Sequence, residues 1–294
     1  MQKRKKLNIK KAGYIGTLDP DVTGVLPVFI GESTKLIDYI SKLNPYKEYS
    51  GTICLGVETT TDDISGEILK IDSNISMKHD IVNFSNLLNE KIKELFLGEI
   101  TQIIPKYSAK KINGKKMYEY ARENIEVETK TNIVNIFSFD ISNVKIEKIN
   151  KYVENSNDVN VLIFDFVVKC STGTYIRSLA KAVGESFNST GTLVSMKRTN
   201  SNGYLLENSI KLNDLEISSI RDPFENTKLE KITVDEHFAK LLANGCIVRK
   251  EQIKINDSCS QDFLIVNSKD KYICIIEEYK KDSKMVKPYK KFNI

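Results

Sequence analysis

Residues 13–31 read GYIGTLDPDVTGVLPVFIG, a loop rich in glycine and proline that leads into a short apolar segment. This composition predicts a turn-forming loop followed by a strand. Pro20 biases Asp19 away from the helical conformation, and Gly16 and Gly24 give the backbone freedom to wrap around a ligand. A carboxylate held this way can act as a nucleophile or a base, but an Asp-Pro turn with a solvated carboxylate explains the same residues. The residues alone leave both interpretations open.

Beyond this loop the hydrophobic pattern changes period several times. Alternation over residues 49–57 and an apolar run over 159–168 predict strands, whereas helical spacing over 84–96 and 176–187 predicts helices. The elements follow one another without a regular βαβ order, so we expect an α+β fold.

The last third of the chain predicts a second, smaller domain. Residues 214–231 are polar and poorly periodic, which is typical of a boundary, and short alternating runs follow in 232–294. We therefore expect one large domain over 1–231 and a small β-rich domain over 232–294.

Composition excludes several classes of site. The five cysteines form no CxxC pair and the chain has two histidines, so we expect reduced thiols in the cytoplasm and no metal site. No apolar run approaches the length of a membrane span, so we expect no membrane partner. The acidic pair Asp62 and Asp63 lies in the string DDISG, which a turn explains without a metal.

Two further residues have a functional and a structural interpretation. Arg177 follows the 159–168 strand at the start of the next helix, in the string GTYIR. An arginine beside a carboxylate favours its ionised form, but a surface arginine in a first helical turn is equally plausible. Tyr49 fits a core position in its strand, and its ring could also stack on an extruded base.

The segment 105–122, PKYSAKKINGKKMYEYAR, combines many basic residues with three tyrosines. Lysines neutralise phosphates and tyrosines stack on bases, so this composition favours RNA binding. A solvated lysine-rich loop is the alternative. Ser108 and Lys111 match the pattern SxxK of β-lactamase-like enzymes, but the accompanying motifs are absent.

Taken together, these strings resemble the TruB family of tRNA pseudouridine synthases. The matching blocks occur in the family's order, at residues 13–40, 47–67, 104–124, 170–187 and 194–204. The resemblance runs from about Lys10 to the end of the chain.

The resemblance implies roles for individual residues. Asp19 would be the catalytic residue, and residues Tyr14, Tyr49, Tyr175, Arg177 and Met196 would contact the substrate. Basic residues expected to contact the RNA backbone are Lys110, Lys111, Lys115, Lys116, Lys197 and Arg198.

The resemblance also implies a fold and a reaction. The fold is a mixed, largely antiparallel sheet flanked by helices over 1–231, with an RNA-clasping insertion around 70–130, and a PUA-like RNA-binding domain over 232–294. The implied reaction converts uridine 55 in the T-arm of tRNA to pseudouridine, without metal or redox cofactor, by a cytoplasmic monomer. Two alternatives stay open: a catalytically inactive relative that binds and folds tRNA, and a synthase acting on another RNA.

Two departures from the family pattern carry expectations of their own. Family members begin with a strand and a KPxGxxS-like loop that this sequence lacks, so we expect an unpaired sheet edge or another segment covering it. Tyr14 and Leu193 stand where the family commonly has histidines. Tyrosine can stack on a base but does not become cationic near neutral pH.

Overall fold

The computed structural model describes residues 9–72, 80–123, 125–128, 130–152, 159–256, 258 and 261–292. The fold divides into two compact units. One unit holds Leu18–Val25 and Pro45–Asn208; the other holds the residues up to Thr17, Leu26–Asn44 and the residues from Ser209 onward. The predicted functional division into 1–231 and 232–294 stays a prediction.

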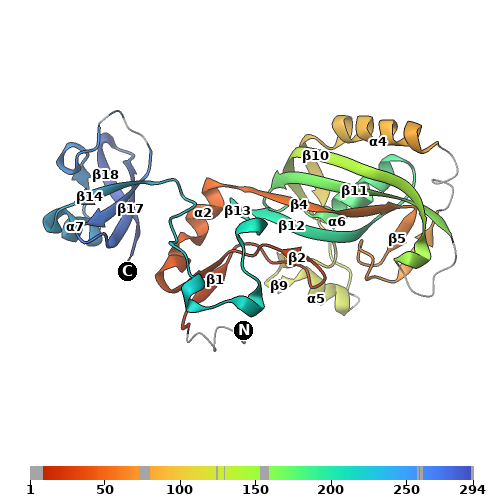
Figure 1. Ribbon diagram of the computed structural model, residues 1–294, viewed down its shortest axis with the longest axis horizontal. Coiled ribbons are helices and arrows are strands. Elements are labelled where there is room, and N and C mark those ends of the chain that lie inside the picture. The colour runs from red at the N-terminus through yellow and green to blue at the C-terminus, as the bar shows by residue number, and fades with distance from the viewer. Residues whose placement is uncertain are drawn as a thin grey trace. The chain divides into compact units, whose positions relative to one another are not determined.

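A seven-stranded sheet forms the centre of the first unit (Figure 1). Six strands follow the spatial order β13-β12-β4-β11-β10-β7, and β2 also pairs with β12. The pairing is antiparallel throughout, except that β2 runs parallel to β12. The predicted mixed, largely antiparallel sheet is therefore confirmed. The strands are β2 (Thr23–Gly24), β4 (Tyr46–Leu55), β7 (Gly98–Ile103), β10 (Thr131–Lys148), β11 (Asn160–Ser171), β12 (Gly191–Ser201) and β13 (Tyr204–Leu205).

Two helices cover one face of this sheet. Alternate residues of β4 and β11, such as Ile53 and Phe164, pack in one buried cluster with α4 (Ile81–Leu95) and α6 (Ile176–Ser186). Helix α4 contributes apolar residues four positions apart, beginning at Phe84, which places them on one side of the helix. Both predicted helices are confirmed. Burial of each such large apolar side chain contributes about 1.5–3 kcal/mol.

Short elements at the edges of the sheet carry the loops that matter for function. Strands β5 (Val57–Thr59) and β6 (Ile68–Ile71) pair around the DDISG turn. Residues 105–122 form the hairpin β8 (Lys111–Ile112) and β9 (Lys115–Lys116), followed by α5 (Met117–Arg122). Of the predicted insertion at 70–130, residues 73–79, 124 and 129 lie outside the described residues, and its grip on RNA stays a prediction.

The second unit contains a five-stranded sheet in the order β14-β16-β17-β18-β15. Its strands are β14 (Glu230–Val234), β15 (Val248–Arg249), β16 (Phe263–Asn267), β17 (Tyr272–Tyr279) and β18 (Asp282–Lys291), packed with α7 (Glu236–Ala243). The strands predicted in this part of the sequence are confirmed.

The same unit also holds the pair β1 (Ala12–Tyr14) and β3 (Val28–Ile30), which flanks the Asp19 loop in sequence, and helix α2 (Ile37–Leu43). Among the described residues, no helix is both long and apolar enough to cross a membrane.

Candidate active site

The Asp19 loop connects to the sheet through β2. The loop turns at Asp19, whose carbonyl accepts a hydrogen bond from the Val22 amide at 3.1 Å. Directly after it, Gly24 pairs with Arg198 of β12 at a φ of +127°. A Cβ at Gly24 would lie 2.3 Å from the Arg198 carbonyl oxygen, so only glycine allows the two backbones this close. The loop is therefore fixed at its C-terminal end, and the Asp19 side chain stays 47% exposed.

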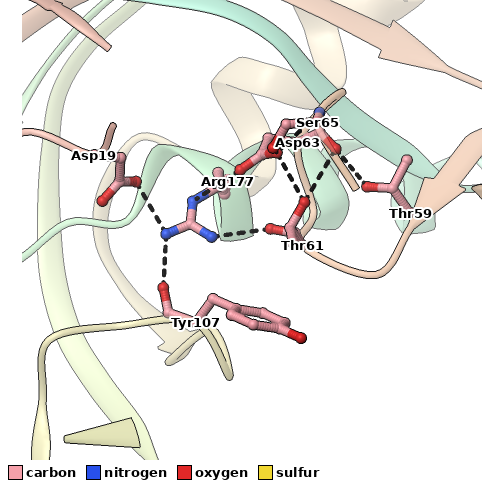
Figure 2. A network of polar contacts seen from close by, with 7 residues as sticks. All are labelled: Asp19, Thr59, Thr61, Asp63, Ser65, Tyr107 and Arg177. Carbon is pink, nitrogen blue, oxygen red and sulfur yellow. Dashed lines mark hydrogen bonds and ion pairs between the residues drawn. The ribbon is translucent and has the colours of Figure 1, made fainter. Parts of the chain in front are cut away.

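Arg177, in the first turn of α6, connects this loop to two other segments (Figure 2). Its Nη2 lies 2.9 Å from Oδ2 of Asp19 and also donates to the carbonyl of Tyr107 at 2.8 Å. Its Nη1 donates to the carbonyl of Thr61 at 2.9 Å, and its Nε lies 3.7 Å from Oδ2 of Asp63. The Arg177 side chain is only 7% exposed, so its planar fork is held by four groups away from water, while the Asp19 carboxylate stays accessible. The structural alternative of a surface arginine is excluded by this burial.

Asp63 is held by the turn that it helps to build. Its Oδ1 accepts hydrogen bonds from the backbone amide and hydroxyl of Ser65 and from the Thr61 hydroxyl, while the Thr59 hydroxyl donates to its carbonyl. The backbone of Leu193 clamps the same turn from β12 through its amide and carbonyl groups. With Oδ1 used in the turn, Oδ2 is the oxygen that faces Arg177.

Sequence reasoning interpreted Asp63 as a turn residue, and it did not include this residue in the site. The turn is present, but it uses one carboxylate oxygen and leaves the second for a contact distant in sequence. No local signal separates this arrangement from an ordinary Asx turn, since the partner Arg177 lies on a different element.

Two predicted tyrosines lie near the Asp19–Arg177 pair. Burial, above all, raises the pKa of Tyr49 to about 12, and the Asp19 charge acts in the same direction. Burial also raises the pKa of Tyr175, which shares a side-chain hydrogen bond with Ser108 and senses the charge of Asp19. Both hydroxyl groups are therefore neutral at neutral pH. Tyr49 is 6% exposed and packs in the main buried cluster, as its core interpretation expects, whereas Tyr175 is half-buried.

Strand β12 places its three predicted residues in different surroundings. Met196 is half-buried against the main core, and Lys197 is exposed. Arg198 is completely buried, with its Nε donating to the Val25 carbonyl at 2.9 Å. The predicted contact of Arg198 with the RNA backbone is therefore wrong for this conformation, because a side chain without accessible surface cannot reach a phosphate.

The remaining predicted residues lie elsewhere on the described chain. Tyr14 belongs to the other compact unit, where its side chain is 55% exposed.

The four lysines predicted in the 105–122 segment differ in their surroundings. Lys110 and Lys111 are exposed, whereas Lys115 pairs with Glu123 and lies over the Tyr120 ring. Lys116 lies over the Tyr118 ring.

Lys47, two residues before Tyr49 on β4, is a partly buried cation. Burial, and next the charge of Arg198, lower the pKa of Lys47 to about 8. Below pH 8 Lys47 is charged in both the folded and the unfolded state. The folded state is then destabilised by the full free-energy cost of keeping this charge partly buried. Between pH 8 and about 10.5 the folded state loses its proton first, so the contribution of Lys47 to the free energy of unfolding rises with pH.

Lys47→Met is therefore expected to raise the free energy of unfolding at pH 7 by about 1–3 kcal/mol, with the gain shrinking as the pH approaches 10. Denaturant melts at pH 7, 8.5 and 10 measure the difference from the wild type. The exposed Lys197→Met is the matched control, with a pH-independent difference near zero. A gain from Lys47→Met that stays constant across this pH range would contradict the assignment.

The arrangement supplies one partly exposed carboxylate, a buried guanidinium that pairs with it, and two neutral phenols that sense its charge. Among the described residues, no group of three or more His, Cys, Asp or Glu side chains is placed to hold a metal ion. Such a set suits covalent or general-base chemistry by the carboxylate on a substrate with a flat ring to be gripped.

The chain is similar to known proteins of one family. The family model described as "TruB family pseudouridylate synthase (N terminal domain)" matches residues 4–176. A curated tRNA pseudouridine synthase B from Clostridium tetani is 38% identical over 291 residues, which cover 97% of this chain and 91% of the relative. The enzyme of the same name from Staphylococcus saprophyticus is 35% identical over 99% of this chain and 92% of its own length.

Solved structures with a similar fold are more distant in sequence. An H/ACA ribonucleoprotein bound to a substrate RNA containing 2′-deoxyuridine includes a chain that matches with a TM-score of 0.57 and 18% identity, over 100% of this chain and 80% of that chain. A Cbf5-Nop10-Gar1 complex gives a TM-score of 0.54 at 20% identity, over 94% of this chain and 72% of that chain. At this level of identity the similarity concerns the fold.

Proposed function

This chain belongs to the TruB family of pseudouridylate synthases, and we propose that it isomerises uridine 55 in the T-arm of tRNA, with Asp19 as the catalytic residue. As a member of this family it is an enzyme that converts uridine to pseudouridine in tRNA. The position in the tRNA and the catalytic role of Asp19 are the parts that need a test. The observation that supports the role of Asp19 is its ion pair with the buried Arg177, at 2.9 Å. The position in the tRNA is proposed from the family resemblance alone.

The reaction has requirements that these residues meet. It breaks the glycosidic bond between C1′ and N1, turns the detached uracil and joins C5 to C1′. A single carboxylate can assist by attacking the ribose or the base, or by removing a ribose proton. Arg177 holds the Asp19 carboxylate in one orientation through the Nη2–Oδ2 contact, so that it meets the extruded nucleotide in a defined geometry.

Binding must also offset the cost of extruding the base, which is a few kcal/mol. Stacking on an aromatic ring contributes roughly 1–3 kcal/mol per base. Burial raises the pKa of both Tyr49 and Tyr175, and both hydroxyl groups sense the charge of Asp19. The half-buried Met196 offers an apolar surface on β12. We propose that these three side chains bind the uracil.

The same site is compatible with the partner and the monomeric state that we propose. Asp19, Arg177, Tyr49 and Tyr175 all come from one unit of one chain, so a monomer holds a complete catalytic set. Cys54, Cys170, Cys246 and Cys274 are free thiols, which fits a reducing compartment such as the cytoplasm. We propose that the enzyme acts there as a monomer on the T-arm, with Tyr14 serving as a substrate contact.

The test is tritium release from a T-arm stem-loop labelled at uridine C5. The proposal expects release from the wild-type protein and none from the same stem-loop with cytidine at position 55. Binding without release by the wild-type protein would instead support an inactive tRNA-binding relative. Release from other RNAs but not from this stem-loop would support a synthase with a different substrate.

The lysines of the 105–122 segment are expected to contribute unequally to RNA affinity. Removing one lysine–phosphate interaction reduces the slope of log affinity against log salt by about 0.7–0.9. Lys110→Gln/Lys111→Gln removes two exposed cations and should lower the slope by about twice that amount. Lys115→Gln/Lys116→Gln should lower it less, because Lys115 already pairs with Glu123 and both side chains lie over tyrosine rings.

Filter binding of the T-arm stem-loop at 50–200 mM salt measures these slopes. Lys42→Gln, an exposed lysine on α2, serves as a control for removal of one charge outside the segment. An unchanged slope after replacement of all four lysines would remove this segment from the RNA interface.

A further inference from the structure

Arg198 is one of the largest side chains of this protein to be completely buried. A guanidinium removed from water is costly unless its N–H groups are hydrogen-bonded, and its removal alone leaves those partners unsatisfied. The hydrogen-bond partners of Arg198 therefore indicate the structural role of this buried side chain.

One partner is the end of the Asp19 loop. Nε of Arg198 donates to the Val25 carbonyl at 2.9 Å, and the Val25 amide donates to the Arg198 carbonyl at 3.0 Å. Gly24 lies beside the Arg198 backbone with no room for a Cβ. The main chain and the side chain of Arg198 thus both bind the segment that follows Asp19 to β12.

The second partner is Tyr49. The two residues lie directly opposite each other on β12 and β4, and their side chains hydrogen-bond. Because a guanidinium can only donate, the Tyr49 oxygen is the acceptor and its own O–H proton must point elsewhere. The Arg198 guanidinium thereby restricts the orientation of the Tyr49 hydroxyl.

We propose that Arg198 is a positioning residue of the synthase, which fixes the Asp19 loop and the Tyr49 hydroxyl relative to each other. This inference rests on the proposed function. Arg177 holds the Asp19 carboxylate from one side, and Arg198 holds the backbone and the tyrosine on which the carboxylate and the base depend. Arg198 touches neither RNA nor the reacting atoms, in contrast to its exposed neighbour Lys197.

The experiment compares Arg198→Lys with the wild type in single-turnover tritium release at saturating tRNA. Lysine keeps the charge but has one nitrogen, so it cannot hold Val25 and Tyr49 in the same geometry. We expect the rate to fall by about 10–100-fold, since a small misplacement in an active site costs this much. Affinity for tRNA and its salt slope should stay unchanged, whereas Lys197→Gln should reduce the salt slope.

Two controls separate positioning from loss of stability. Thr199→Val changes the neighbouring residue, whose hydroxyl donates to Glu48, and should leave the rate unchanged. Val161→Ala makes a cavity in a separate buried cluster, so it should lower Tm while leaving the rate at an assay temperature far below Tm unchanged.

Arg198→Lys is also combined with Tyr49→Phe, which removes the hydroxyl and keeps the ring. If Arg198 acts through this hydroxyl, the effect of Arg198→Lys must be smaller in the Tyr49→Phe background. If Arg198→Lys lowers the tritium-release rate equally in the wild-type and Tyr49→Phe backgrounds, the inference is overturned. It is also overturned if Arg198→Lys reacts at the wild-type rate and has a reduced salt slope for tRNA affinity. Absence of tritium release by the wild-type protein would instead contradict the proposed function.

Discussion

Asp19→Asn is expected to reduce the rate of pseudouridine formation by about 10⁴-fold or more, to the background of the assay. The amide has nearly the same shape but cannot act as a nucleophile or a base. The loop itself should persist, because its turn is closed by the backbone bond from Val22 to Asp19 and its end is fixed on β12. Single-turnover tritium release from tRNA labelled at uridine C5 measures the effect.

The sequence offers a close control for this variant. Asp21 lies in the same loop and is exposed, so Asp21→Asn removes the same charge two residues away. Its rate should stay within about twofold of the wild type, and both variants should bind the T-arm stem-loop with wild-type affinity. Activity of Asp19→Asn within tenfold of the wild type would remove Asp19 from the chemical step.

Arg177→Lys is expected to lower the same rate by about 10²–10³-fold and to lower Tm. Arg177 uses all three of its nitrogens, toward Asp19, Tyr107, Thr61 and Asp63, and one ammonium group cannot satisfy them together. Arg177→Met should be less stable still, by about 1–3 kcal/mol relative to the wild type, because it leaves two carbonyls and two partly exposed carboxylates without their donor. Single-turnover rates and thermal melts measure the two effects.

A companion variant tests whether Asp63 acts through Arg177. Asp63→Asn should slow the reaction by about 10–100-fold, because it weakens the contact that orients the guanidinium. Lys181→Met is the control: it lies one turn further along α6 and pairs with Asp62 and Glu58 rather than with Asp19 or Asp63. A wild-type rate for Asp63→Asn alongside an inactive Arg177→Lys would show that Asp63 has no positioning role.

The sequence predicted the elements whose signal is local. The helix at α4 follows from apolar residues four apart, and the strand at β11 follows from an uninterrupted apolar run. Asp19 was identifiable because glycine and proline around it dictate an unusual loop, and the resemblance to a family raised that residue above its structural alternative. Each of these signals is contained in a short run of neighbouring residues.

The contacts of Asp63 and Arg198 were decided by the tertiary structure. Asp63 looks like a turn residue until its second oxygen meets Arg177, and Arg198 looks like an RNA contact until the strand buries it against Val25 and Tyr49. Neither contact has a period or a local motif, since the partners come from strands and loops distant in sequence. The linear chain thus determined which residues could carry charge and where the backbone could turn. Only the packing of β12 against β2 and β4 decided which charges are removed from water and what they hold in place.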